Sequence, residues 1–144
     1  NKTLYFSDTR ASIIWAFDFC LNTGAMTNKR IFVDLSQEIG RPDGATVDEE
    51  GYLWNAQVIG GELIRYTPDG LVDRRIGMPV KNVTSVNFGG PKLDTLYVTS
   101  MARVSHPAVH ERFTIEKKSQ YLAGSLFAVT GLGIRGVPEP RFGG

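Results

Sequence analysis

A leucine followed by an aromatic residue recurs three times in this 144-residue chain, at Leu4-Tyr5, Leu53-Trp54 and Leu96-Tyr97. After each pair come a small or polar stretch, a loop and a second apolar run. The copies stand about 40 to 50 residues apart, which is the repeat length of β-propeller blades. The repeat therefore predicts a chain made of about three copies of one supersecondary unit.

The apolar runs within these copies are short and of β type, because aromatic and β-branched residues dominate them and turn residues separate them. They cover 3–8, 12–19, 29–35, 45–48, 51–56, 61–67, 71–77, 84–88, 94–100 and 124–130. A helical apolar period is weak throughout, and its best candidate is 107–122. The chain is therefore predicted to be all-β, a β-propeller of about three four-stranded blades, with a small β-sandwich as the alternative.

Three blades do not close a ring, since closed propellers have typically about four to eight. The outer faces of the two end blades would be apolar and prone to association. We therefore expect the missing blades to come from an absent N-terminal part, a second chain or a symmetric copy. The sequence has no initiator Met and opens directly in a strand-like run, which suggests a fragment or a processed chain.

Charge and composition exclude several classes of function. A net charge of +1 gives no footprint for nucleic acid. No apolar stretch reaches the roughly 18 residues that span a bilayer, so no membrane partner is predicted. Cys20 is the only cysteine, which excludes an intrachain disulfide and suits the cytoplasm. We expect Cys20 to be a small core residue rather than a nucleophile.

The tripeptide Pro-Asp-Gly occurs twice, at 42–44 and at 68–70. Both copies have turn chemistry, and Asp69 lies between two runs that should form a hairpin. Asp43 instead follows a longer loop and precedes the strand that begins a blade, which should line the central channel. A carboxylate there could bind a hard cation or act as a general base. The residues alone favour a turn at Asp43 over a ligand.

The runs "RPDGATVDEEGYLWNA" (41–56), "FGGPKLDTLYVTS" (88–100) and "GSLFAVTGLGIRGVPEPRFGG" (124–144) are more specific. They resemble the senescence-marker-protein (regucalcin), gluconolactonase and luciferin-regenerating-enzyme family, over nearly the whole chain. The resemblance implies a six-bladed propeller with one divalent cation on its axis, Ca²⁺ first, with Zn²⁺, Mg²⁺ or Mn²⁺ also possible. It implies hydrolysis of sugar-derived lactones, with Asp43 as metal ligand and general base.

The same resemblance implies that residues 1–144 form the C-terminal half of the ring and that the N-terminal half is absent. The family's other metal ligands, a Glu and an Asn, precede this chain, as do its sugar-contacting Arg and Asn. The chain alone should therefore lack a competent site, because a single carboxylate rarely holds Ca²⁺. We expect it to associate with the missing half or to form a homo-oligomer.

Other polar residues are secondary candidates. Asn55 could face the channel wall, and Thr84 and Ser85 occupy the blade entrance equivalent to that of Asp43, so these residues are predicted to contact substrate or water. Asp8 and Asp18 are expected to bond turns and neighbouring backbone instead.

Two further motifs are given structural interpretations. The segment Gly131–Gly136 matches a dinucleotide fingerprint, but two prolines follow it and a helix does not. His106 and His110 have a zinc-ligand spacing, yet Pro107 between them favours a loop.

Two functions from different classes are consistent with the sequence. The first is a metal-dependent hydrolase of sugar-type lactones. The second is a half-propeller that has lost its site and serves only as a scaffold or an assembly and binding module. The mass of the native species and its metal uptake separate the two.

Overall fold

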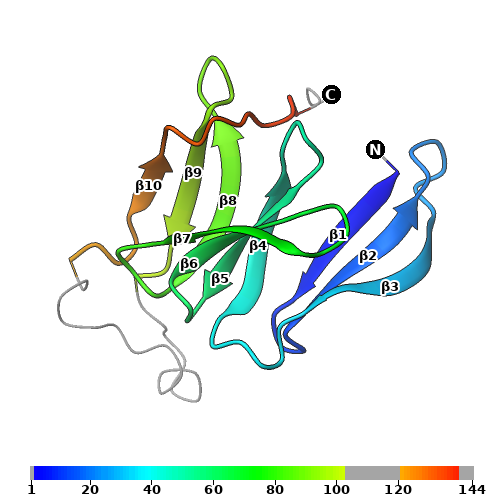
Figure 1. Ribbon diagram of the computed structural model, residues 1–144, viewed down its shortest axis with the longest axis horizontal. Helices are drawn as coiled ribbons and strands as arrows, with labels where there is room; N and C mark the ends of the chain where they lie inside the picture. The colour runs from blue at the N-terminus through cyan, green and yellow to red at the C-terminus, as the bar shows by residue number, and fades with distance from the viewer. Residues whose placement is uncertain (1, 103–120, 140–144) are drawn as a thin grey trace.

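A computed structural model describes residues 2–102 and 121–139 of the chain. All regular elements of these residues are β-strands, in three antiparallel sheets (Figure 1). The sheets are β1-β2-β3, β4-β5-β6-β7 and β10-β9-β8. The strands are β1 Thr3–Asp8, β2 Ile13–Phe19, β3 Met26–Asp34, β4 Arg41–Val47, β5 Leu53–Val58, β6 Glu62–Tyr66, β7 Val72–Gly77, β8 Val83–Gly89, β9 Thr95–Ser100 and β10 Leu126–Val129. The predicted all-β class is confirmed, and the described residues include no helix able to span a membrane.

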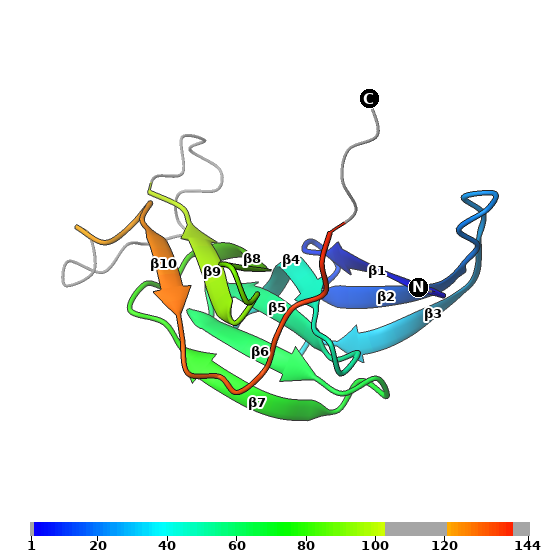
Figure 2. The same ribbon diagram turned by 90° about the horizontal axis from the view of Figure 1, so that it is seen from above.

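The three sheets diverge from a common inner side, where Figure 2 shows β1, β4 and β8. β4 contacts β1 on one side and β8 on the other. The repeated Leu-aromatic pairs lie on β1, β5 and β9, so β1 is the counterpart of the second strand of the middle sheet. Among the described strands, the first sheet therefore has no counterpart of β4, and the third has none of β7. The expected partial propeller is confirmed, but only its middle sheet has four strands.

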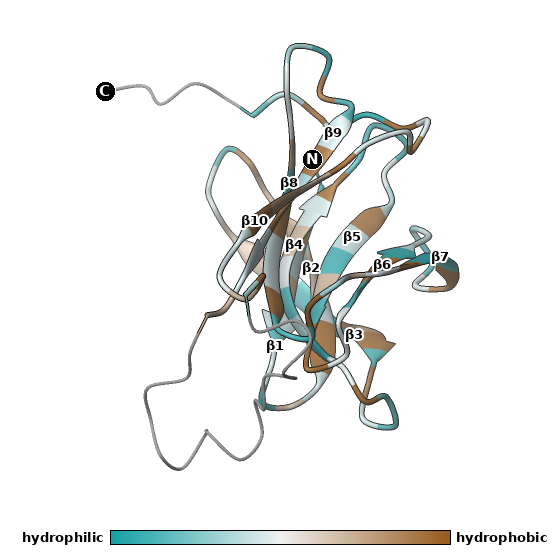
Figure 3. Ribbon diagram, turned by 90° about the vertical axis from the view of Figure 1, so that its left-hand side faces the viewer, coloured by the Kyte–Doolittle hydropathy of each residue, from teal (hydrophilic) through white to brown (hydrophobic). Residues whose placement is uncertain are grey.

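Two apolar cores lie between the three sheets, and β5 contributes to both. Leu53 belongs to the core shared with the first sheet, and Trp54 belongs to the core shared with the third. Neighbouring residues divide in this way because successive side chains of a strand point to opposite faces. Every residue of β5 is buried, although Figure 3 shows hydrophilic residues interrupting its hydrophobic ones. Burial of each large apolar side chain contributes roughly 1.5–3 kcal/mol.

The outer face of the first sheet carries large apolar side chains that are partly exposed, with Lys29 lying over the Trp15 ring. Phe6 pairs with Trp15 and Trp15 with Ile31, so the three side chains form a row on one face. Phe6 and Ile31 are each more than half exposed, at 53% and 54%. The outer face of the third sheet, opposite its apolar core, is mixed, since its rows contain Asn87, Tyr97 and Ala128 and also Ser85, Thr99 and Leu126. At the inner strand β8, Ser85 and Asn87 of this face contact β4. The prediction of two apolar end faces is therefore correct only for the first sheet.

A buried ionic cluster fixes the turn that follows β4. Asp48 accepts hydrogen bonds from the Trp54 indole at 2.9 Å and from the Arg65 Nε at 2.8 Å. The Arg65 guanidinium stacks on the Tyr52 ring at 3.8 Å and also bonds Glu50 and Asp73. Burial alone would lower the pKa of Arg65, but its three carboxylate partners raise that pKa above its ordinary value. The pairing compensates the cost of burying these charges.

Several sequence predictions outside the site have clear outcomes. Asp69 lies in the β6–β7 turn, as predicted. The next residue, Gly70, has a φ of 81°, and the Gly70 amide donates to the Thr67 carbonyl. The prediction that Cys20 is a core residue is wrong, because Cys20 is exposed in the turn after β2. Its apolar neighbours belong to β2, whereas Cys20 itself begins the turn. Asp8 bonds the Ala11 amide, as expected of a turn, while Asp18 pairs across strands with Arg30 at 2.8 Å.

Two predictions concern a part of the chain that is not described. The histidine pair lies wholly outside the described residues. The helical candidate 107–122 lies outside them except for its last two residues.

Candidate functional site

Asp43 lies on a β-bulge in the inner strand β4. The register pairs Pro42 with Gln57 and Ala45 with Asn55, so Asp43 and Gly44 together face the single residue between those partners. The prediction of a turn at 42–44 is therefore wrong. Proline is tolerated here because β4 is an edge strand and the position adjoins a bulge. A β-bulge changes the direction in which a side chain points, and here the affected side chain is the Asp43 carboxylate.

Gly44 lets the inner strands β4 and β8 approach closely. A Cβ atom at Gly44 would lie 2.6 Å from the Ser85 Cβ and 2.7 Å from the Ser85 Cα, and it would also contact the Ser85 hydroxyl. Such separations lie far inside the ordinary 3.5–4.0 Å between carbon atoms. Glycine is thus required for contact between strands, and not for a turn. This contact places Ser85 beside the bulge that carries Asp43.

Asn55 holds the backbone of the bulge from the neighbouring strand. Its Nδ2 donates to the Asp43 carbonyl at 2.8 Å, to the Gly44 carbonyl at 3.3 Å and to the Ser7 hydroxyl at 3.2 Å. Ser7 lies on β1, so one amide group joins two sheets. Asn55 is fully buried, and these groups occupy its donor atoms. Its predicted contact with substrate stays a prediction.

The Asp43 carboxyl is half-buried, and this burial raises its pKa. A hydrogen bond from the Gly44 amide acts in the opposite direction but is the smaller effect. No ion pair of the described residues includes Asp43. The carboxylate is thus partly desolvated without a balancing cation.

An oxygen ligand of this kind suits a hard divalent cation such as Ca²⁺. Within 2–102 and 121–139, however, no three or more His, Cys, Asp or Glu side chains gather to hold a metal. Asp43 therefore fits as one ligand, and the described residues do not supply a complete set.

The remaining predicted residues lie on β8. Ser85 is exposed and lies against Gly44. The Thr84 hydroxyl shares a hydrogen bond of 2.8 Å with Thr99 on β9. The structure thus brings Asp43, Asn55 and Ser85 to one place, with Thr84 one residue further along the inner strand. The substrate contacts predicted for Thr84 and Ser85 stay predictions.

Ser7 and Gln57 belong to the same group of residues and are not among the predicted site residues. The Gln57 Nε2 donates to the Asn55 Oδ1 at 2.6 Å, and Gln57 is fully buried. The sequence signal was available, since "LWNAQV" places two amides two residues apart in an apolar strand. That spacing puts both side chains on the same face.

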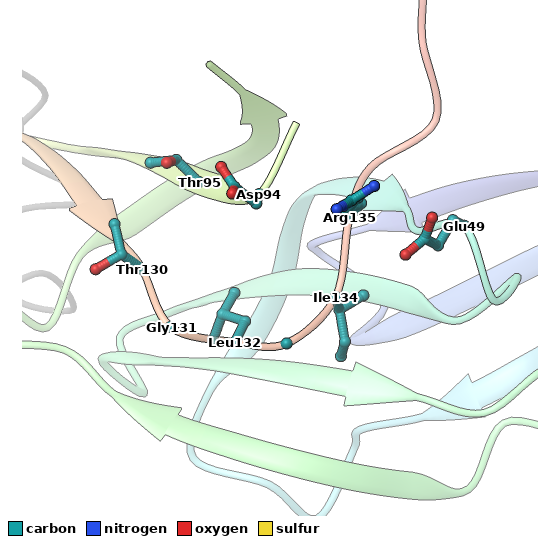
Figure 4. A pocket seen from close by; sticks show the side chains of 9 residues that line it. Glu49, Asp94, Thr95, Thr130, Gly131, Leu132, Ile134 and Arg135 are labelled. Carbon is teal, nitrogen blue, oxygen red and sulfur yellow. The ribbon is translucent and has the colours of Figure 1, made fainter. Parts of the chain in front are cut away.

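A separate cavity of about 370 Å³ lies beside the segment that follows β10 (Figure 4). Glu49, Asp94 and residues 130–135 line it, and Asp43 is not among its lining residues. The segment is fixed by bonds from the Glu49 amide to the Arg135 carbonyl and from the Gly136 amide to the Leu93 carbonyl. Gly131 and Gly133 have positive φ in this loop, which agrees with the structural role predicted for the 131–136 motif.

Comparison with known proteins gives a consistent result. The family model described as "SMP-30/Gluconolactonase/LRE-like region" matches residues 1–102. Regucalcin of Xenopus laevis is 36% identical over all of this chain, which covers 46% of that protein. The pentonolactonase XacC of Haloferax volcanii is 42% identical over 69% of this chain and 34% of its own length.

A solved structure from Agrobacterium tumefaciens, described as a calcium-binding protein, regucalcin, matches 96% of this chain and 45% of its own. Its TM-score is 0.81 at 30% identity. The chain thus spans about half the length of the regucalcins it matches. The extent of the family-model match shows that the chain belongs to the SMP-30/gluconolactonase/LRE-like family.

Proposed function

We propose that the protein carrying this chain is a metal-dependent hydrolase of sugar-type lactones, with Asp43 as a metal ligand and general base. The observation that carries the proposal is the bulge in β4, which presents a half-buried carboxylate without an ion-pair partner. The substrate class is supported by the relative named a pentonolactonase. The cation is supported by the structural neighbour described as calcium-binding.

The chemistry assigned to Asp43 is proton transfer. Its carboxylate takes a proton from a water molecule as the water oxygen forms a bond to the lactone carbonyl carbon. The ring C–O bond then breaks, and the departing oxygen takes up a proton to give the open hydroxy acid. A divalent cation, when bound, would polarise the carbonyl.

The site needs residues beyond those described, because Ca²⁺ takes about six to eight oxygen ligands. We propose that these come from the other half of a six-bladed ring, supplied by the rest of the protein or by an associated chain. The described strands support this proposal, because β1 is the counterpart of the second strand of the middle sheet and no described strand pairs with its other edge. An added inner strand would pair with that free edge of β1.

A second candidate function is an assembly module that has no catalytic site. The exposed Phe6–Trp15–Ile31 row favours it, since large uncovered apolar faces mark interaction surfaces. The native mass and Ca²⁺ uptake of the purified protein discriminate the two. A six-blade species that binds Ca²⁺ supports the hydrolase, and a species that takes up no divalent cation supports the module. A cytoplasmic location stays a prediction from the single cysteine.

The hydrolase is tested by removing and restoring the metal. The protein is treated with a chelator and then assayed with a pentonolactone and a gluconolactone, using the acid released as the readout. We expect hydrolysis to fall to the uncatalysed rate and to return when one of Ca²⁺, Zn²⁺, Mg²⁺ or Mn²⁺ is added. Hydrolysis that is unchanged by the chelator would refute the metal requirement, and no hydrolysis of either lactone would refute the substrate class.

A further inference from the structure

Two side-chain amides are buried inside β5, where neighbouring positions are apolar. Asn55 and Gln57 both have 0% exposure. An amide that is buried without hydrogen bonds destabilises a protein, because it loses its bonds to water. Both residues therefore need partners within the fold, and the direction of each amide shows what those partners are.

The hydrogen bonds fix the direction of both amides. The Asn55 side chain faces the carbonyl oxygens of Asp43 and Gly44, which only accept hydrogen bonds, so its NH₂ group must point toward them. Its Oδ1 then needs a donor, which the Gln57 Nε2 supplies at 2.6 Å. The Gln57 Oε1 is left without a partner in the described residues. The hydrogen bonds thus run in one direction, from Gln57 through Asn55 to the bulge.

This series of hydrogen bonds ends at the backbone carbonyls of Asp43 and Gly44. The Asp43 carbonyl belongs to the peptide unit that follows the Asp43 Cα, so a bond to it restrains ψ of Asp43. The bond to the Gly44 carbonyl restrains the next peptide unit in the same way. Both residues lie outside the regular pairing of β4 with β5. The Asn55 amide therefore holds a stretch of backbone that the strand register does not hold.

We propose that Asn55 is a positioning residue for Asp43, oriented by Gln57, and that it sets where the Asp43 carboxylate lies relative to a bound cation. The proposal rests on the proposed function and deepens it. This role needs no contact between Asn55 and substrate, because the Asn55 side chain is fully buried and acts through its bonds within the fold. Through its bond to the Ser7 hydroxyl, Asn55 also links the bulge of β4 to β1.

The test compares Asn55→Leu, which keeps the volume and removes the donors, with wild type. Asn87→Ala is the matched control, since Asn87 accepts the hydroxyl of Thr46 at 3.0 Å between β4 and β8 but does not contact the bulge. Ca²⁺ alone is titrated into each protein and followed by calorimetry. We expect Asn55→Leu to weaken Ca²⁺ binding about 10- to 100-fold, the usual effect of removing a group that orients a metal ligand. It should lower kcat for lactone with KM nearly unchanged, while Asn87→Ala matches wild type.

A folded Asn55→Leu variant that binds Ca²⁺ as tightly as wild type would overturn the proposal. If that variant does not fold, Gln57→Met takes its place and should weaken Ca²⁺ binding in the same direction, and wild-type affinity in it would count against the proposal. A second readout separates this inference from the proposed function. Even if the wild type binds no Ca²⁺, amide hydrogen exchange at Gly44 and Ala45 should be faster in Asn55→Leu than in Asn87→Ala. Equal exchange would overturn the positioning role.

Discussion

Replacing Gly44 by alanine tests whether β4 and β8 must touch at the bulge. The new Cβ would lie 2.6 Å from the Ser85 Cβ and 2.7 Å from the Ser85 Cα, about 1 Å inside ordinary contact. One of these atoms belongs to the backbone, so a change of rotamer cannot relieve the overlap and the strands must separate. Overpacking of this kind costs typically about 1–3 kcal/mol. At roughly 3 °C per kcal/mol for a domain of this size, Tm should fall by about 3–9 °C.

Gly77→Ala is the matched control, because a Cβ at Gly77 meets nothing within 4 Å and its φ is not positive. This change should leave Tm unchanged or raise it slightly, since alanine restricts the unfolded chain. Adding Ser85→Gly to Gly44→Ala should recover part of the loss, because it removes the overlap with the Ser85 side chain but not with its Cα. Thermal unfolding followed by circular dichroism measures all four proteins. A Gly44→Ala variant as stable as Gly77→Ala would refute the close approach of β4 and β8.

Two further predictions concern carboxyl groups. Asp48→Asn should destabilise the fold by about 3–5 kcal/mol in urea unfolding, because it leaves the buried Arg65 without its fully buried partner. Glu50→Gln should cost less than about 1 kcal/mol, since Glu50 is 55% exposed, and similar losses in both would count against the cluster. Burial raises the pKa of the Asp43 carboxyl in the folded state above its unfolded value of about 3.9. The contribution of this group to folding stability is therefore fully present below about pH 3.9, and it is lost as pH rises through the folded-state pKa. In chelator, Asp43→Asn should therefore gain stability relative to wild type between about pH 3.5 and pH 7, whereas a difference that does not change with pH would contradict this.

The fold was largely predictable because its signals are local. Leu53 and Trp54 mark a strand buried on both faces, and the same pair on β1 and β9 marks the equivalent strands. The sequence could not show that the first repeat begins on the second strand of its sheet, because strand order depends on pairing between distant segments. The outer face of the third sheet was mispredicted for a related reason, since its exposed rows combine residues from three separate strands.

The local geometry of the candidate site was not predictable from the sequence. Pro42, Asp43 and Gly44 have the same composition as the turn at 68–70, yet their partner strand turns them into a bulge. The glycines of the two Pro-Asp-Gly segments are needed for different reasons. Gly70 adopts a positive φ, and Gly44 lets β8 approach β4 closely. Asn55 was assigned to substrate because a polar residue in a channel strand suggests a ligand contact. Its bonds to the bulge appear only when β4 and β5 are paired.

We propose that Asp43, and not Asp69 of the second Pro-Asp-Gly segment, carries the chemistry of the site. The decisive experiment measures lactone hydrolysis at saturating Ca²⁺ in the protein carrying this chain, with Asp43→Asn and Asp69→Asn compared to wild type. Asp69 is exposed in the turn between β6 and β7, so it serves as the matched control. We expect Asp43→Asn to lose the Ca²⁺-dependent hydrolysis, by at least about 100-fold for a general base, and Asp69→Asn to keep wild-type activity. Equal activity in the two variants would contradict this proposal.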